Sequence, residues 1–308
     1  MSTNRREFLA TASLVLAGGA FGRVALAARR QAQAPPPAPA FTDLRGNIGI
    51  FTARGGTIGW FVSPDGVVVI DSQYPDTAAA CLEGINQRSS KRPVDVLFVT
   101  HHHGDHTAGL VTFKPVTKKI VAHVKEVEAQ KAATKPGSEA TAVYADRTFT
   151  ETWTEKLGPE TIEAVYLGPA HTGGDAIIFF QRANVVHMGD LVFNRLYPYI
   201  DRPGGASVRG WVARLEEVHR TFPADAIYIF GHGNPKFGVT GTRDDLLVLR
   251  DLFSALLDHV QKGLAAGKSR EEITALDNLP GFPDFHAPPP NRLAGNLGVV
   301  YDELTAKS

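Results

Sequence analysis

The residues of this chain best suited to chemistry lie in one short stretch, Val99 to His106, which reads VTHHHGDH. Four histidines and one aspartate fall within six residues there, directly after an apolar run. Imidazole nitrogens and carboxylate oxygens are common ligands of zinc and related metal ions. Six adjacent residues cannot enclose a metal ion by themselves, so a metal site here requires ligands from elsewhere in the chain.

Three later segments offer such ligands. Each is a glycine-containing stretch at the end of an expected strand, and they contain His171, Asp190 and His232. One histidine in such a loop is more often structural than metal-binding, and Asp190 alone could cap a helix. Four loops of this kind on one layer are hard to attribute to chance, because ligand sites gather at the carboxyl ends of strands in α/β folds. The set predicts a metal centre, with zinc favoured and iron or manganese as alternatives.

The elements that must position these residues alternate along the chain. Residues 48–70 are expected to form an antiparallel meander of three strands, with a turn at 63–66. Helices and strands then interleave up to about residue 230, which indicates an α/β layered domain. The later segments 244–263, 269 onward and 293–305 are expected to be helices that cover the sheet and supply no ligand cluster. The interleaved elements are helices at 76–87, 124–133 and 211–222 and strands at 96–100, 162–166, 176–180, 185–187 and 226–230.

The ordered ligand set resembles the signature of the metallo-β-lactamase superfamily, H-x-H-x-D-H followed by a histidine, an aspartate and a histidine. The resemblance covers about residues 45–240. It implies an α/β fold, the four-layer αβ/βα sandwich, here with additional C-terminal helices. It also implies three roles for the candidate ligands: His101, His103 and His171 for one metal, Asp105, His106 and His232 for a second, and Asp190 as a bridge between them.

The ligand count then indicates the chemistry. Two zinc ions per chain, each with an open position and about 3.5 to 4 Å apart, can share a hydroxide formed near neutral pH. This hydroxide would cleave an ester, thioester or lactone bond of a small-molecule substrate. Asp105 is the candidate catalytic residue, because it could orient the hydroxide and pass a proton to the leaving group.

Two other enzymes stay open as alternatives. The first is a periplasmic metallo-β-lactamase that hydrolyses β-lactam antibiotics. The resemblance weighs against it, because the β-lactamases proper usually lack the bridging aspartate that Asp190 supplies here. The second is a mononuclear iron sulfur dioxygenase of the same fold, which would not need the second ligand set.

Several residues are candidates for supporting roles. Asp71 ends an expected strand and is predicted either to support the metal loops or to cap a turn, and Thr172 and Asp175 are similar candidates. The loop at 193–205 is expected to line the pocket. Within it, Arg195 or Arg202 could hold a substrate carboxylate, although a solvated arginine is the commoner outcome. The residues expected to have no role at the metals are His102, His123, His187, His219, His259, His286 and Cys81.

The N-terminal segment predicts export. Arg5 and Arg6 precede an apolar stretch, and Ala25-Leu26-Ala27 is a cleavage signal of small residues. The expected divisions are a twin-arginine signal peptide at 1–27, a Pro/Ala-rich linker at 28–40, the catalytic domain at 41–280 and a C-terminal extension at 281–308. The chain is therefore expected in the periplasm or outside the cell, with the twin-arginine export machinery as a partner and no stable membrane span after cleavage.

The composition argues against nucleic acid as a partner and against disulfide bonds within the chain. Lys plus Arg and Asp plus Glu both number 32, so no basic field suggests nucleic acid. A single cysteine, Cys81, rules out an intrachain disulfide even in an oxidising compartment. The core or bound metal must supply the stability.

Overall fold

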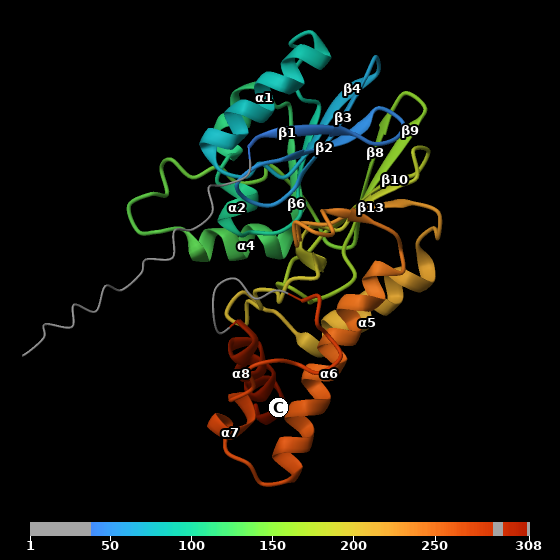
Figure 1. Cartoon of the computed structure of the whole chain (residues 1–308). Helices are drawn as coiled ribbons and strands as arrows, with labels where there is room; N and C mark the ends of the chain where they lie inside the picture. Colours follow the sequence, from blue (N-terminus) through green and yellow to red (C-terminus); the bar gives the residue numbers. More distant parts are fainter. Residues whose placement is uncertain (1–37, 286–291, 307–308) are drawn as a thin grey trace, which may run out of the picture. The chain divides into compact units, whose positions relative to one another are not determined.

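The computed structural model describes residues 38–285 and 292–306 (Figure 1), which belong to one compact unit. The expected signal peptide, nearly all of the expected linker and His286 lie outside the described residues. Among the described helices, none is long and apolar enough to cross a membrane.

The first sheet has seven strands, which neighbour one another in chain order. The pairs from β1 to β4 are antiparallel and those from β4 to β7 are parallel. The carboxyl end of β5, where the histidine cluster begins, therefore lies between the same ends of two neighbours. The strands are β1 (Ala40–Asp43), β2 (Ile48–Thr52), β3 (Ile58–Ser63), β4 (Gly66–Ile70), β5 (Val96–Val99), β6 (Ile120–His123) and β7 (Arg147–Phe149).

The second sheet has six strands in the order β15-β13-β11-β10-β9-β8. Its one parallel pair, β11 with β13, carries Asp190 and His232 in the segments that follow its two strands. A separate parallel pair, β12 with β14, joins these two segments. The strands are β8 (Thr152–Leu157), β9 (Glu160–Val165), β10 (Ile177–Phe180), β11 (Val185–His187), β12 (Phe193–Asn194), β13 (Ile227–Ile229), β14 (His232–Gly233) and β15 (Thr240–Gly241).

Helices cover the outer face of each sheet (Figure 1). Beside the first sheet lie α1 (Pro75–Ser89), α3 (Leu110–Phe113) and α4 (Val124–Ala133). Beside the second lie α5 (Val208–Thr221) and α6 (Asp245–Ala265), with α7 (Arg270–Thr274) and α8 (Arg292–Thr305) packed on α6. The short helices α2 (Gly104–Thr107), η1 (Lys114–Val116) and η2 (Gly189–Leu191) complete the described set.

Alternation along the strands divides the core into layers. Val68 and Phe98 point to the apolar layer between the two sheets, while Val69 and Leu97 point to the layer beneath α1. This period of two is what a strand buried on both faces requires. Trp211 of α5 lies in a third layer, between the second sheet and the C-terminal helices. The αβ/βα sandwich with extra C-terminal helices is thus confirmed.

Several strands differ from the expectation. The strands that were not predicted are β1, β6, β7, β8 and the two-residue strands β12, β14 and β15, and β1 begins at Ala40, the last residue assigned to the linker. β6 is only four residues long and passes directly into α4, so its apolar residues show no period of their own. Cys81 is buried in α1, where burial raises the pKa of its thiol, in agreement with the packing role expected for it.

Candidate metal centre

All seven predicted ligands converge at one end of the sandwich. His101 and His103 follow β5, while Asp105 and His106 lie in the first turns after it. The other three, His171, Asp190 and His232, come from the β9–β10 connection, from η2 and from β14. One local expectation was wrong: the motif was interpreted as a loop throughout, whereas residues 104–107 form the helical turn α2, with His103 as its N-cap. This turn points Asp105 and His106 to a different part of the centre from His101 and His103.

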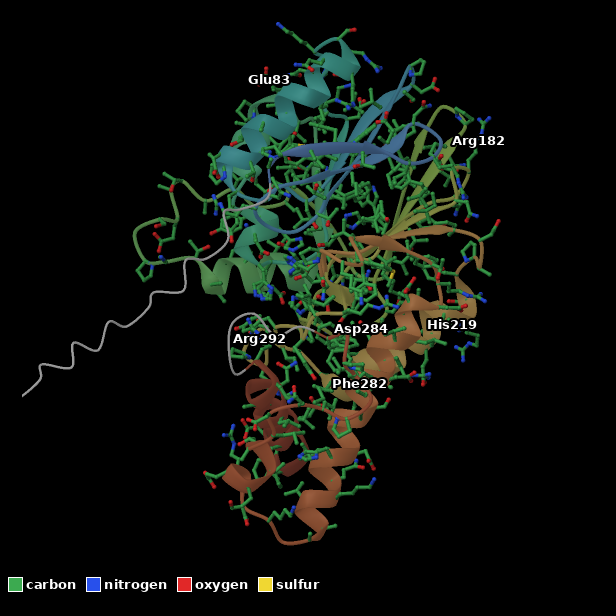
Figure 2. All side chains as sticks on the ribbon, in the orientation of Figure 1. Glu83, Arg182, His219, Phe282, Asp284 and Arg292 are labelled. Atoms are coloured by element: carbon green, nitrogen blue, oxygen red, sulfur yellow. The ribbon has the colours of Figure 1, made fainter. Side chains whose placement is uncertain are left out.

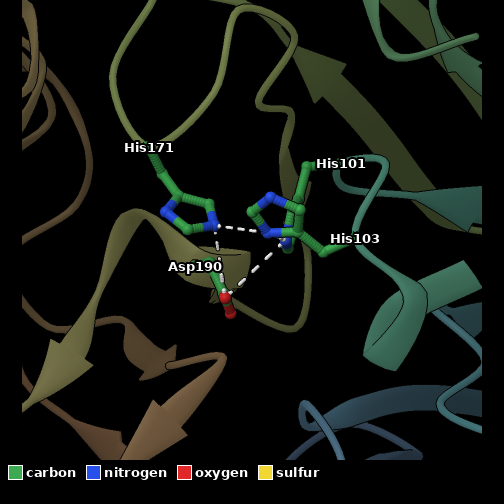
Figure 3. A group of neighbouring side chains, drawn as sticks. All are labelled: His101, His103, His171 and Asp190. Atoms are coloured by element: carbon green, nitrogen blue, oxygen red, sulfur yellow. Dashed lines mark hydrogen bonds and ion pairs between the residues drawn. The ribbon is translucent and has the colours of Figure 1, made fainter. Parts of the chain in front are cut away.

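The first group comprises His101, His103, His171 and Asp190 (Figure 3). The Nδ1 atom of His103 lies 3.1 Å from Nε2 of His101 and 3.0 Å from Nε2 of His171. Oδ2 of Asp190 lies 3.6 Å from the first of these Nε2 atoms and 3.4 Å from the second. Three ring nitrogens and one carboxylate oxygen thus surround a common point.

The second group comprises Asp105, His106 and His232. Nε2 of His232 lies 3.1 Å from Oδ2 of Asp105, and Nε2 of His106 lies 3.8 Å from the same oxygen. Asp190 also reaches this group, with Oδ1 3.0 Å from Nε2 of His106 and Oδ2 3.4 Å from Nε2 of His232. One carboxylate therefore contacts both groups.

The hydrogen bonds at the back of the histidine rings establish which nitrogens face inward with a lone pair. Nδ1 of His171 donates to the carbonyl of Tyr199 at 3.0 Å, and Nδ1 of His106 donates to the Asp71 carboxylate at 2.7 Å. Nε2 of His103 donates in the same way to Asp201 at 3.0 Å. A neutral imidazole carries one N–H, so the inward nitrogen of each ring is left as an acceptor.

Inward lone pairs at about 3 Å from one another cannot hydrogen-bond and instead suit a shared cation. The same holds for Nε2 of His106 and Oδ1 of Asp190, which are buried, face each other and make no hydrogen bond among the described residues. Burial lowers the pKa of His171 to about 3, so this ring is neutral and able to ligate. The donor set therefore fits two metal ions with nitrogen and oxygen ligands.

His106 and His232 show the opposite electrostatic balance. Burial alone would lower the pKa of each imidazole, but nearby carboxylates, Asp190 foremost, raise the pKa of His106 well above its ordinary value and that of His232 to about 9. Two carboxylates around one ring create a demand for positive charge, which a proton or a metal ion can meet.

Asp71 supports the centre from behind. Its carboxylate accepts from the backbone N–H and the hydroxyl of Thr100 at 2.8 and 2.7 Å, as well as from His106. The hydroxyl oxygen of Thr100 is in turn 3.0 Å from Nδ1 of His101. Asp71 is fully buried with φ of 64°, a conformation that non-glycine residues seldom adopt and that often accompanies functional sites. Of the two roles predicted for Asp71, the contacts favour support of the metal loops.

Asp201 also supports the centre, although no sequence pattern predicted this role. Its Oδ2 atom lies 3.0 Å from Nε2 of His103 and 3.2 Å from Nε2 of His102, while its Oδ1 accepts from the N–H of Gly204. Asp201, His102 and His103 form a third cluster of ligand type. Because Nδ1 of His103 faces the first group, a carboxylate on its other nitrogen is the usual orienting partner of a metal-binding histidine. His102 faces Asp201 and lies outside the first two groups, as expected.

The two other supporting candidates, Thr172 and Asp175, act within their own loop. Asp175 accepts from the backbone N–H and the hydroxyl of Thr172, which fixes the chain after His171.

His187 donates to the carbonyl of Thr57 and accepts from the N–H of Gly189, next to Asp190. His123, His219 and His259 contact groups away from the centre.

A cavity of about 470 Å³ opens onto the two groups of candidate metal ligands, called the metal groups below. His103, Asp105, Asp190 and His232 form its floor. Its walls come largely from the loop predicted to line the pocket, through Phe193, Leu196, Tyr197 and Tyr199, with Tyr74 and Arg292 beside them.

The two arginines predicted as substrate anchors are engaged elsewhere. Arg195 forms an ion pair with Asp245 at 2.6 Å, and Arg202 donates to the carbonyl of Ala206 and lies 3.5 Å from Glu303. Neither lines the cavity. The cation at its wall is Arg292, which comes from the C-terminal extension.

Comparisons with known proteins agree with this geometry. A family model described as the Metallo-beta-lactamase superfamily matches residues 52–232. The metallo-beta-lactamase type 2 of Elizabethkingia meningoseptica is 24% identical over 178 residues, which are 58% of this chain and 68% of that protein. The alpha subunit of a 2,4-dinitroanisole O-demethylase from Nocardioides sp. (strain JS1661) is 28% identical over 42% of this chain, but the match spans only 38% of the subunit.

Two solved structures show the same fold at low identity. A double mutant of the sec-alkyl sulfatase PisA1 aligns with a TM-score of 0.66 and 17% identity, over 88% of this chain and 51% of that one. A metallo-beta-lactamase from Pontibacter korlensis aligns with a TM-score of 0.56 and 18% identity, over 70% of this chain and 99% of that one.

Proposed function

This chain belongs to the metallo-β-lactamase superfamily, typically metal-dependent hydrolases, and on that premise we propose that it is a dinuclear zinc hydrolase of ester, thioester or lactone bonds. The observation that carries the proposal is the position of Asp190, whose two oxygens reach both ligand groups. A bridging carboxylate of this kind supports a two-metal site rather than a single one. The substrate would be a small molecule that enters the cavity above Asp190.

The proposed ligands divide as the two groups do. His101, His103 and His171 would hold one ion, Asp105, His106 and His232 the other, with Asp190 between them. When bound, the two ions would supply Lewis acidity and lower the pKa of a bound water toward neutrality. Iron or manganese would fit the same nitrogen and oxygen donors.

The protein's own residues have two tasks in this proposal. Asp71, Asp201 and the Tyr199 carbonyl hold the histidine rings so that the required nitrogens face inward. Asp105 lines the cavity floor, which supports its proposed role: it would accept a proton and return it to the leaving group. The largely aromatic walls would shield part of the substrate from water.

β-Lactam hydrolysis is the second candidate. Two curated relatives of 24% and 26% identity are metallo-beta-lactamases, and an exported chain would meet β-lactams outside the inner membrane. The sulfur dioxygenase alternative is less well supported, because Asp105, His106 and His232 form a second group that a single iron would not need.

The test combines metal analysis with a substrate panel. The purified full chain would be analysed for metals by mass spectrometry, then assayed with a thioester, a lactone, a cephalosporin and a carbapenem. We expect about two zinc ions per chain and turnover of the thioester or lactone well above that of the β-lactams. The reverse order would favour the β-lactamase, and one iron per chain with oxygen uptake on a persulfide would refute the dinuclear hydrolase.

A further inference from the structure

Arg292 is the first residue of α8, yet it lines the cavity above the metal groups. Figure 2 places it at the end of α8 nearest the site loops. Of the described residues that line this cavity, it is the only Arg or Lys. A helix of the C-terminal extension thus contributes a cation to a pocket that is otherwise built from the sandwich.

The guanidinium of Arg292 lies over an aromatic ring that fixes its place. Its central carbon is 5.5 Å from the centre of the Tyr199 ring, within the range of a cation–π contact. The Tyr199 ring centre is in turn 5.4 Å from that of His103. Two successive ring contacts therefore connect the Arg292 guanidinium, through Tyr199, to His103, a proposed metal ligand. One small molecule can reach both Arg292 and the ligand groups.

The charge of Arg292 is not compensated by the described parts of the chain. No ion pair of Arg292 occurs there, and its Nε atom is buried without a hydrogen-bond acceptor. Arg195 and Arg202 differ in this respect, because both donate hydrogen bonds to acceptors of the protein itself. A planar guanidinium whose N–H groups have no acceptor among the described residues, and which lies beside a cavity, is suited to a bidentate oxyanion.

We propose that Arg292 determines substrate specificity by binding an anionic group, of carboxylate or sulfate type, that the substrate carries at a distance from the bond cleaved. This inference rests on the proposed hydrolase function, because it assigns the orientation of a substrate in that same cavity. The bond to be cleaved lies over Asp190, and the anion lies against Arg292 and Tyr199.

The test compares two p-nitrophenyl esters with the same leaving group. One is the neutral butyrate ester, and the other is the glutarate monoester, whose acyl chain ends in a free carboxylate. In Arg292→Ala we expect KM for the glutarate monoester to rise by about 10- to 100-fold, the usual effect of losing a charged hydrogen bond. KM for the butyrate ester, kcat for both esters and metal content should change by less than about threefold.

Two further variants separate binding from structure. Arg292→Lys should restore part of the affinity for the glutarate monoester, because a point charge without the planar fork remains. Arg209→Ala removes the same charge from an exposed position on α5, outside the cavity, and should leave both esters unaffected. A mainly structural role of Arg292 would instead lower turnover of both esters and reduce metal content, which would overturn the proposal.

A binding measurement keeps the inference independent of turnover. Calorimetric titration of the metal-loaded protein with glutarate should give a dissociation constant that rises about tenfold or more in Arg292→Ala and is unchanged in Arg209→Ala. Equal affinity of wild type and Arg292→Ala for glutarate would overturn the inference even if both esters are cleaved. Loss of glutarate affinity in Arg292→Ala, with neither ester cleaved, would support the anion site and refute the ester hydrolase.

Discussion

The carboxylate of Asp201 lies 3.0 Å from Nε2 of His103, across a separation of 98 residues in the sequence. This contact fixes the ring so that Nδ1 points to His101 and His171. The loop that forms the wall of the cavity thereby also orients one proposed metal ligand through Asp201 and a second, His171, through the Tyr199 carbonyl. In the proposed enzyme, one loop would therefore influence both the shape of the substrate cavity and the affinity for metal.

Asp201→Asn should weaken metal binding. The amide retains an acceptor for Gly204 but no longer accepts from His103, so the ring is less well oriented. We expect metal affinity to fall by about 10- to 100-fold, the usual effect of losing such a partner. Competition with a fluorescent zinc chelator measures it. His102→Ala removes the neighbouring contact to Asp201 and a ring contact to His103 but keeps the Asp201–His103 hydrogen bond, so it is the control. An equal loss in both variants would contradict the orienting role.

Removal of Asp190, the proposed bridge between the two metal ions, should affect both metal content and the stability of the fold. In Asp190→Ala we expect lower occupancy of the Asp105–His106–His232 group and loss of most turnover, with the fold retained. Bound metal stabilises the native state by about 1.4 kcal/mol for each tenfold excess over its dissociation constant. The fall in melting temperature on adding a chelator should therefore be smaller in Asp190→Ala than in wild type. Two metals and normal turnover in the variant would show that Asp190 is not a bridge.

The sequence predicts much of the ligand set because strand ends can be recognised locally. An apolar run followed by glycine together with histidine or aspartate marks the ends of β5, β11 and β13, and parallel neighbours bring such ends together. Asp201 and Arg292 carry no comparable signal. Each lies in an irregular segment or at a helix end, and only the tertiary fold places it near His103 or the cavity. The same limit explains why Arg195 and Arg202 were considered as anchors, since their partners Asp245 and Glu303 are distant in sequence.

The C-terminal helix should stabilise the catalytic domain through Glu303. Its carboxylate accepts from the N–H groups of Val208 and Arg209 and from the hydroxyl of Ser207, at the first turn of α5. Glu303→Ala leaves these helix-start donors without their acceptor and should cost about 1 to 2 kcal/mol. Calorimetry should record a melting temperature about 2 to 6 °C lower.

Glu271→Ala, which removes an exposed carboxylate on α7, serves as the control for Glu303→Ala. Since α8 also carries Arg292, its loosening in Glu303→Ala should raise KM for the glutarate monoester. An unchanged melting temperature would show that α8 does not contribute to the stability of the domain.

The export proposal depends on the arginine pair near the N-terminus. Replacement of Arg5 and Arg6 by lysine together should retain the precursor in the cytoplasm, because the twin-arginine machinery recognises the pair. Cell fractionation and the mass of the exported form measure the outcome. Replacement of Arg29 and Arg30, a second arginine pair beyond the expected cleavage site, is the control and should leave export intact. Unchanged secretion of the lysine variant would contradict this route.

Glu126 should make stability depend on pH. It is 1% exposed on α4, and neither carboxylate oxygen has a hydrogen-bond partner among the described residues. Burial, with a smaller contribution from Asp71, raises its pKa to about 8. An unfolded glutamate titrates near pH 4.3, so between that pH and about 8 the folded state holds a proton that the unfolded state has released. Stability must then fall as pH rises through this window, by up to about 1.4 kcal/mol per pH unit.

Glu126→Gln removes this titration while keeping the size of the side chain. The free energy of unfolding of the variant relative to wild type should rise between pH 5.5 and pH 8, by on the order of 3 kcal/mol. Denaturant unfolding at several pH values measures it, and taking the difference from wild type cancels the titration of the metal-site histidines. Glu128→Gln, an exposed position on the same helix, should show no such trend. A constant difference between Glu126→Gln and wild type across this range would mean that the buried carboxylate finds a partner, such as water, that keeps its pKa near the ordinary value.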